Sequence, residues 1–252
     1  MRRFGIYFLK KQGVTRGGTN MSKKITVVAS LLALANFFAF AATADVIYSQ
    51  EPLDGGFAIV SDFLFFGEQE LDDFVLDAGG ATITDVHWWG AYGGDPDPTE
   101  SDEFTVRFFE ESEAASGVPS GTYLYEYVTG AADRTATAMT TPGYGAHDGG
   151  VVYEYMFFLP TPIALDGDTN YYLSIVNDSE SLWGWLQGED LAGGHWYRTG
   201  DPAYTGTWAP SGIGGDFAFE LTGTPIPEPA TLLILGGLGA GMATARKLRK
   251  NR

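Results

Sequence analysis

The middle of the chain alternates apolar and polar residues in short runs, which are separated by turns rich in Gly, Pro and Asp. The clearest runs are residues 82–89, 103–109, 121–128, 151–159, 170–177 and 216–222. Because successive side chains of a strand point to opposite faces, Phe104, Val106 and Phe108 share one face. An apolar face of this kind needs a second sheet to cover it. The pattern predicts an all-β fold, a jelly-roll-like antiparallel β sandwich of about ten to twelve strands.

The composition of the chain agrees with this fold class. No segment of ten or more residues in the middle carries a helical stripe bounded by caps, which argues against an α/β enzyme fold. Phe, Tyr and Trp make up 14% of the chain, and there is no Cys. A core rich in aromatic residues is typical of β structure, and without disulfides its packing alone must stabilise it. The roughly 180 residues between the two ends suit one domain.

The first 44 residues have the features of a signal peptide. Two lysines precede a largely apolar run over residues 25–42, and small residues follow it. We expect a signal peptide helix over residues 1–44, with Met21 as the true start. A retained transmembrane helix is the alternative. The signal peptidase site is formed by Ala42, Ala44 and Asp45, with cleavage after Ala44.

The other end of the chain has three parts. Pro227, Glu228 and Pro229 precede an uncharged segment over residues 230–245 and a basic tail over residues 246–252. At 1.5 Å per residue, a helix over the uncharged segment is about 24 Å long, short of the roughly 30 Å hydrocarbon core. It would therefore span only where the bilayer thins or flanking residues help. The basic tail would stop translocation.

This order of parts resembles the PEP-CTERM family of sorting signals over residues 225–252. The resemblance implies that an exosortase, a membrane-embedded cysteine transpeptidase-like enzyme, processes the chain near Pro227, Glu228 and Pro229. The chain would be exported, held in the inner membrane by a C-terminal transmembrane helix, and then delivered to the outer surface or the extracellular space. A permanent membrane anchor is the alternative.

The body over residues 45–224 also resembles a type of domain that is common in PEP-CTERM proteins, and this resemblance implies no activity. The segments that carry it are residues 72–74, 86–90, 104–109, 171–177 and 183–185.

Charge separates the ends of the chain from its middle. Of the 15 basic residues, only Arg107, Arg134 and Arg198 lie in the middle, whereas all 32 acidic residues lie between Asp45 and Glu228. Because Lys and Arg beside apolar segments stay on the cytoplasmic side, the acidic middle is expected to be the exported part. A polyanionic body also repels DNA and RNA, so we exclude nucleic acid as a partner.

The sequence shows no arrangement of catalytic residues. There is no Cys and no Gly-x-Ser-x-Gly motif, and the histidines are His87, His147 and His195. Carboxylates are so frequent that a pair of them cannot identify a glycosidase. We therefore predict no catalytic residue and a non-enzymatic protein of the cell surface or extracellular matrix. A secreted hydrolase stays an alternative.

One acidic loop could bind calcium. Residues 95–103 hold five carboxylates in nine positions, and hard cations favour oxygen ligands on flexible loops, although the spacing is not that of an EF-hand. A solvated loop without a cofactor is the alternative. The candidate ligands are Asp95, Asp97, Glu100 and Asp102. The second acidic loop, residues 166–168, predicts only a tight turn.

Tryptophans offer a second functional hypothesis. Trp88 and Trp89 are adjacent and must point to opposite faces of a strand, whereas Trp183 and Trp185 share a face. Exposed indoles can stack on sugar rings. The candidates for stacking on extracellular polysaccharide are Trp183, Trp185 and Trp89, which would make the body a carbohydrate-binding module. The alternative is that these rings close the core of the sandwich.

Overall fold

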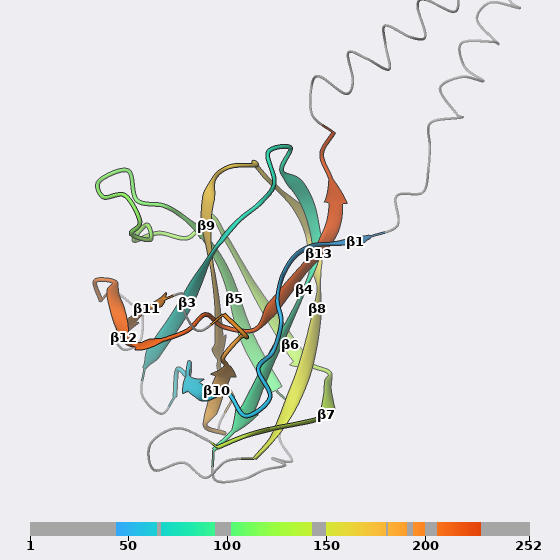
Figure 1. Ribbon diagram of the computed structural model, residues 1–252, viewed down its shortest axis with the longest axis vertical. Coiled ribbons are helices and arrows are strands. Elements are labelled where there is room, and N and C mark those ends of the chain that lie inside the picture. Colours follow the sequence, from blue (N-terminus) through green and yellow to red (C-terminus); the bar gives the residue numbers. More distant parts are fainter. Residues whose placement is uncertain are drawn as a thin grey trace, which may run out of the picture. The chain divides into compact units, whose positions relative to one another are not determined.

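The computed structural model describes residues 44–64, 67–93, 102–142, 150–179, 181–190, 194–199 and 206–227. These residues form thirteen strands and no helix, so none of them supplies a helix that could span a bilayer. The strands form two sheets in which every strand pairing is antiparallel (Figure 1). The predicted all-β antiparallel sandwich is confirmed. The two predicted flanking helices lie outside the described residues.

The larger sheet is built around β4. Its strands are β1 (Asp45–Gln50), β2 (Ala58–Val60), β4 (Ala81–Tyr92), β7 (Arg134–Thr141), β8 (Gly150–Leu165), β10 (Trp183–Leu186) and β13 (Phe219–Pro225). Along one edge β4 pairs with β8, and along the other it pairs first with β13 and then with β10. The sheet continues from β13 to β1, from β10 to β2 and from β8 to β7.

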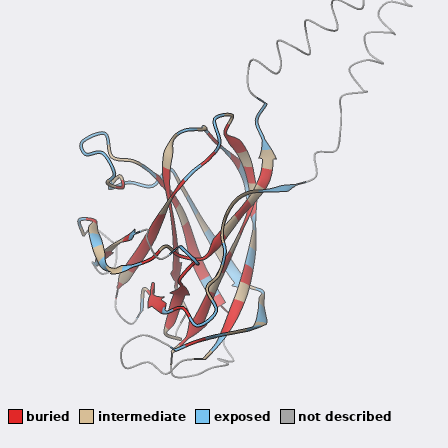
Figure 2. Ribbon diagram, in the orientation of Figure 1, coloured by how far each residue is buried: buried red, intermediate tan, exposed pale blue. Residues whose placement is uncertain are grey.

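The smaller sheet has six strands in the order β12, β11, β3, β9, β5 and β6. Their bounds are β3 (Glu68–Val75), β5 (Asp102–Glu110), β6 (Tyr125–Ala132), β9 (Asn170–Asn177), β11 (Gly194–Thr199) and β12 (Ala209–Gly214). Most neighbours in this sheet are distant in sequence, because the chain repeatedly crosses to the larger sheet and returns. Buried residues follow the strands of both sheets, and the turns are largely exposed (Figure 2).

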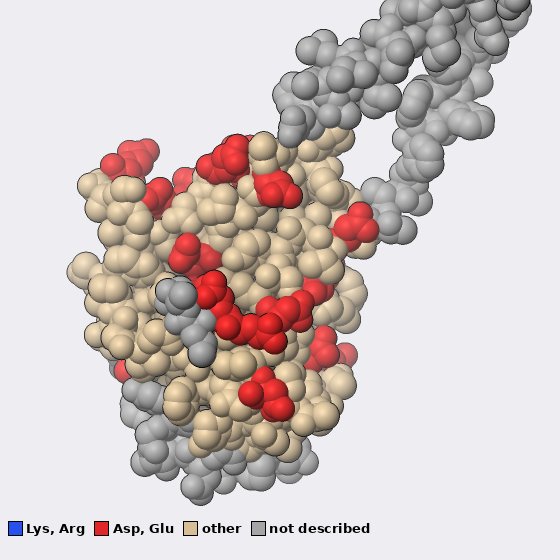
Figure 3. Space-filling view, viewed as in Figure 1, with Lys and Arg blue, Asp and Glu red and all other residues tan. Residues whose placement is uncertain are grey.

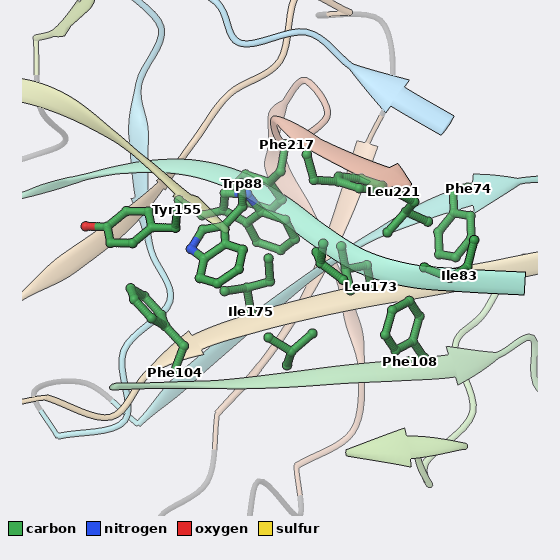
Figure 4. Packing of buried hydrophobic residues seen from close by; sticks show 14 of the residues in the cluster. Phe74, Ile83, Trp88, Phe104, Phe108, Tyr155, Leu173, Ile175, Phe217 and Leu221 are labelled. Carbon is green, nitrogen blue, oxygen red and sulfur yellow. The ribbon is translucent and has the colours of Figure 1, made fainter. Parts of the chain in front are cut away.

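The inner faces of the two sheets bury a core rich in aromatic residues (Figure 4). Trp88 of β4 lies edge-on to Phe104 of β5, with 5.2 Å between ring centroids, and stacks at 5.4 Å on Tyr155 of β8. Both geometries suit the quadrupoles of aromatic rings. Phe104, Val106 and Phe108 are all fully buried. The prediction that these three side chains share an inward face is confirmed.

Two predicted strands begin later than the sequence pattern suggests. The run over residues 121–128 joins the sheet as β6 only from Tyr125. After β5, residues 111–123 leave the edge of the sheet. The chain returns to this edge at Leu124, whose N–H donates to the carbonyl of Phe108. The run over residues 216–222 joins as β13 from Phe219. Alternation alone does not show where a chain reaches its partner strand.

The predicted tight turn at residues 166–168 is confirmed. Asp168 has a φ of 54°, in the left-handed region that Asp tolerates, and its N–H donates to the carbonyl of Leu76 at 3.0 Å. Gly167 has no room for a side chain, since a Cβ there would lie 2.1 Å from the carbonyl oxygen of Asp77. The two acidic side chains therefore belong to a turn between β8 and β9.

Candidate functional site

The described fold begins and ends beside the two predicted processing sites. Ala44 is exposed, and β1 begins at the exposed Asp45. At the other end, β13 ends at Pro225, and Pro227 is exposed. The other residues of the two sites, Ala42, Glu228 and Pro229, lie outside the described residues.

Of the four candidate calcium ligands, the structure describes Asp102, which is buried at the start of β5. One Nη of Arg134, on β7 of the larger sheet, donates to both carboxylate oxygens of Asp102 at 3.2 Å. Burial raises the pKa of Asp102 to about 6, although the guanidinium opposes the rise. Asp102 thus forms an ion pair that joins the two sheets. The calcium hypothesis now depends on Asp95, Asp97 and Glu100, which lie outside the described residues.

Within the described ranges, no group of three or more His, Asp or Glu side chains is arranged to hold a metal ion. A calcium titration that follows the melting temperature tests the calcium prediction, and an unchanged melting temperature would contradict it.

Trp183 and Trp185 do not form a surface platform. They share the inward face of β10, and both are 0% exposed. Trp185 stacks on Phe217, with centroids 4.6 Å apart, and its Nε1 donates to the carbonyl of Ala218 at 2.9 Å. Trp183 lies edge-on to Phe104 at 5.0 Å. Trp183 and Trp185 therefore cannot stack on sugar rings, and the alternative, that these rings close the core of the sandwich, is confirmed. Burial of their large apolar surface stabilises the fold.

Trp89 is the predicted stacking residue that lies on an outer face. It is half-buried, and its direct neighbour on β8 is Glu154. The next outward pair along the two strands is His87 and Met156. Met156 is 44% exposed and Phe158, further along β8, is 64% exposed. We call the outward residues of β4, β8 and β13 the open face, which combines aromatic and apolar surface with polar groups.

His87 lies at the centre of the open face among carboxylates of three strands. Its Nε2 is 3.1 Å from an oxygen of Asp85, and its Nδ1 is 3.6 Å from an oxygen of Glu154. Glu220 on β13 is directly opposite His87. Burial raises the pKa of Glu220, and His87 opposes this rise. The cluster offers many hydrogen-bond acceptors to a hydroxyl-rich or cationic ligand.

A buried carboxyl group ties the smaller sheet to the chain entering β13. Asp72 on β3 is fully buried and accepts a hydrogen bond from the N–H of Phe217. Burial raises the pKa of Asp72 well above its usual value, and the nearby Asp216 adds to the rise. Partial burial likewise raises the pKa of Asp216 to about 6, with Asp73 and Asp190 adding to it. Asp72 acts inside the fold, whereas Asp216 is half-buried.

His195 and Glu70 form a second buried polar pair. The Nδ1 of His195 is 2.9 Å from the carbonyl of Gly215, to which it must donate, and its Nε2 lies 3.6 Å from Glu70 Oε2. Burial lowers the pKa of His195 and raises the pKa of Glu70 well above its usual value. Burial therefore favours the neutral form of each group. Their enclosure keeps this histidine from reaching a substrate.

A cleft of about 700 Å³ lies over the outward side of the smaller sheet. Residues 111–124 and 206–208 lie across this side, which we call the covered face. Arg198 of β11 lines the cleft, and its guanidinium carbon is 4.2 Å from the ring centroid of Trp208. Trp208 packs edge-on against Phe109 at 5.4 Å, and its Nε1 donates to the carbonyl of Ser120 at 2.8 Å.

The sequence did not predict this cleft, because its lining residues lie in segments that are far apart in the chain and share no local sequence pattern. Arg198 and Trp208 are brought to Ser120 only by the pairing of β11 with β3. A usable signal was present, since Arg198 is among the three arginines of an otherwise acidic body.

Acidic side chains gather on the face of the described fold in Figure 3, and no Lys or Arg side chain is seen there. The three arginines of the body make close contacts with other residues. Arg107 pairs with Glu126 at 2.7 Å, Arg134 pairs with Asp102, and Arg198 Nε donates to Gln69 at 2.7 Å. A site that contains an arginine thus carries a positive charge within an otherwise acidic surface.

Comparison with known proteins places residues 46–222 in one family model, described as Domain of unknown function (DUF7901). No curated protein matches the chain. The chain is similar to the cysteine protease and lectin-like domains of Cwp84, a surface layer associated protein of Clostridium difficile, at 9% identity and a TM-score of 0.39. That match covers 63% of this chain and 32% of the other, so the chain spans about a third of that protein's length.

A second similarity is to the full particle of Israeli acute paralysis virus heated to 63 degrees, at 8% identity and a TM-score of 0.12. It covers 73% of this chain and 94% of the other. With TM-scores this low, neither solved structure bears on function.

Proposed function

We propose that this chain, which belongs to the family of the Domain of unknown function DUF7901, is an exported, non-enzymatic protein of the cell surface or extracellular matrix. Its sandwich is the mature body, and its two ends are signals that direct export. A PEP-CTERM tail over residues 225–252, processed by an exosortase, delivers the body to the outside.

The observation that carries this proposal is where the fold begins and ends. β1 begins at Asp45, the residue expected to follow signal peptidase cleavage, and β13 ends at Pro225, just before Pro227. The two strands pair with each other, with Asp45 opposite Gly223. Removal of both predicted signals would leave each described strand and this pairing intact. Strands that lie entirely between the two predicted processing sites are what such trimming requires.

The topology supports the jelly-roll-like part of the proposal. Successive connections cross from one sheet to the other, as from β2 to β3, from β3 to β4 and from β4 to β5. Such crossings distribute neighbouring strands of the sequence over both sheets, as in double-sheet Greek-key folds.

The surroundings of the two described histidines support a non-enzymatic body; His147 lies outside the described residues. His195 is enclosed with Glu70 inside the fold. Both ring nitrogens of His87 face the carboxylates of Asp85 and Glu154, so in these contacts the imidazole does not activate a Ser or Thr hydroxyl. A general base next to a nucleophile is the arrangement that covalent hydrolysis needs.

Replacement of Pro227, Glu228 and Pro229 by Ala tests delivery. We expect the parent protein at the outer surface or in the medium, and the variant in the inner-membrane fraction, because the protease loses its recognition sequence. The matched control replaces the exposed Pro160 and Pro162 of β8 by Ala, and it should be delivered like the parent. A tail variant that distributes like the parent, or a parent that stays in the cytosol, would contradict the proposal.

The open face supports a second candidate function, the binding of polysaccharide. The half-buried Trp89 supplies a ring surface for a sugar, and the exposed Met156 and Phe158 continue the apolar surface further along β8. His87 and Glu154 supply hydrogen-bonding groups. A pull-down with extracellular polysaccharide should lose the Trp89→Ala variant and keep the parent. Equal retention of the two proteins would remove this face from consideration.

A further inference from the structure

We infer that the cleft on the covered face binds a carboxylate-bearing sugar, as presented by an acidic polysaccharide of uronate units. The inference deepens the proposed extracellular role and depends on it for the source of the ligand. It concerns a different site from the open face, and it rests on the cavity, on the setting of Arg198 and on the exposed ring of Tyr123.

Arg198 is held in place by a relay of hydrogen bonds across three strands. Its Nε donates to Gln69 Oε1 at 2.7 Å, and Gln69 Nε2 donates to Ser174 Oγ at 2.9 Å. Ser174 Oγ in turn donates to the carbonyl of Glu70 at 2.6 Å. One Nη of Arg198 is also 3.4 Å from the carbonyl of Gly121. A guanidinium is costly to bury without such partners, so the chain supports this cation with a dedicated set of groups.

Aromatic rings form the walls around the guanidinium. Trp208 is almost fully buried and packs against it, with Phe109 behind. Tyr123 also lines the cleft, is 48% exposed, and packs edge-on against Phe109 at 6.4 Å. An exposed ring held at one edge is suited to the apolar C–H face of a sugar. The cleft thus places a cation next to a stacking surface.

Hydroxyl groups complete the lining of the cleft. Ser112, Thr122 and Thr207 line it, and a hydroxyl can both donate to and accept from the hydroxyls of a sugar. The volume of about 700 Å³ falls in the range of about 300–1,000 Å³ that is typical of sites for small ligands. A cation, a ring surface and hydroxyls are the groups that a uronate unit requires.

Charge explains why the ligand should be acidic. The planar fork of an arginine matches the two oxygens of a carboxylate. The rest of the body is acidic and repels a polyanion, so a uronate chain can gain affinity only where arginine lines a cleft. A second cation is close, since the guanidinium of Arg107 lies 5.9 Å from the ring centroid of Tyr123. A neutral polysaccharide would gain no ion pair from these two arginines.

The test is calorimetric titration of the purified full chain with polygalacturonate and, in parallel, with neutral dextran. We expect binding of polygalacturonate that weakens as salt is added, and no binding of dextran. Arg198→Lys keeps the charge but loses the fork, and Tyr123→Ala removes the exposed ring, so each should weaken binding by about tenfold. Phe158→Ala on the open face is the matched control and should bind like the parent.

Because Tyr123 is about half exposed, Tyr123→Ala should melt at the temperature of the parent, which separates lost binding from lost folding. The inference is overturned if the parent does not bind polygalacturonate, if dextran binds equally well, or if the folded Tyr123→Ala variant binds like the parent. Processing of the two ends is measured separately by mass, so failed binding would leave the export proposal intact.

Discussion

The two outer faces of the sandwich use tryptophan and charge in different ways. On the covered face, Trp208 is buried beneath residues 111–124 and packs against Arg198. On the open face, Trp89 stays half-buried beside Glu154, and no arginine is among its strand neighbours. The covered face is hollowed into a cleft. The difference teaches that a concave site on a β sandwich is built by the segments that cross a sheet, and not by the sheet alone.

The largest expected contrast between the faces is in stability. Trp208→Ala removes a ring that packs on Phe109 and Arg198 and donates to Ser120, so it should lower the free energy of unfolding by about 3 kcal/mol. Trp89→Ala removes a half-exposed ring and should cost about 1 kcal/mol. Urea denaturation of the two variants measures both values. Equal losses would show that residues 111–124 do not cover the sheet as described.

A change of pH tests the half-buried Asp216, which lies near Asp72 between the two outer faces. The pKa of Asp216 is raised in the fold to about 6 from 3.8. The favourable contribution of Asp216 to the free energy of unfolding is therefore fully present below about pH 4 and is lost as the pH rises through about 6. In the parent, stability should fall over this pH window, and Asp216→Asn should reduce this fall by about 1 kcal/mol. The effect is small because solvent screens a carboxylate that is not fully enclosed. The melting temperature, measured between pH 4 and 6, reports the difference.

The control for this experiment is Asp77→Asn, at an exposed turn position, which should keep the pH profile of the parent. A parent protein whose stability rises between pH 4 and 6 would contradict the assignment of Asp216.

The smallest expected effect concerns the charged centre of the open face. His87→Ala leaves Asp85, Glu154 and Glu220 close together without the imidazole. Asp85 is buried, but Glu154 and Glu220 are only half-buried. Because solvent screens these two carboxylates, the loss should be about 0.5 kcal/mol, and added salt should reduce it. Thermal melting at low and high ionic strength measures the effect. A loss of several kcal/mol would mean that the open face is more tightly organised than its exposure indicates.

The fold class followed from local alternation, because period-2 patterning reports which side chains of a strand point inward. Phe104, Val106 and Phe108 were placed correctly for this reason, and so was the opposition of Trp88 and Trp89. This information is local to each strand.

What alternation could not supply is the identity of the strand or segment that covers a face. The burial of Trp183 depends on Gly90 of another strand, where a Cβ would lie 2.2 Å from the indole ring. The cleft depends on Arg198 and Trp208 meeting Ser120. Both contacts are set by long-range pairing, so reasoning from local sequence left open whether Trp183 and Trp185 are exposed or buried, and it found no cleft.

The mass of the mature protein, recovered from the cell surface or the medium, tests the central claim most directly. We expect a chain that begins at Asp45 and ends within Pro227, Glu228 and Pro229, together with any group attached at the new end. An intact chain that still ends at Arg252 and is found in the cytosol would contradict the account.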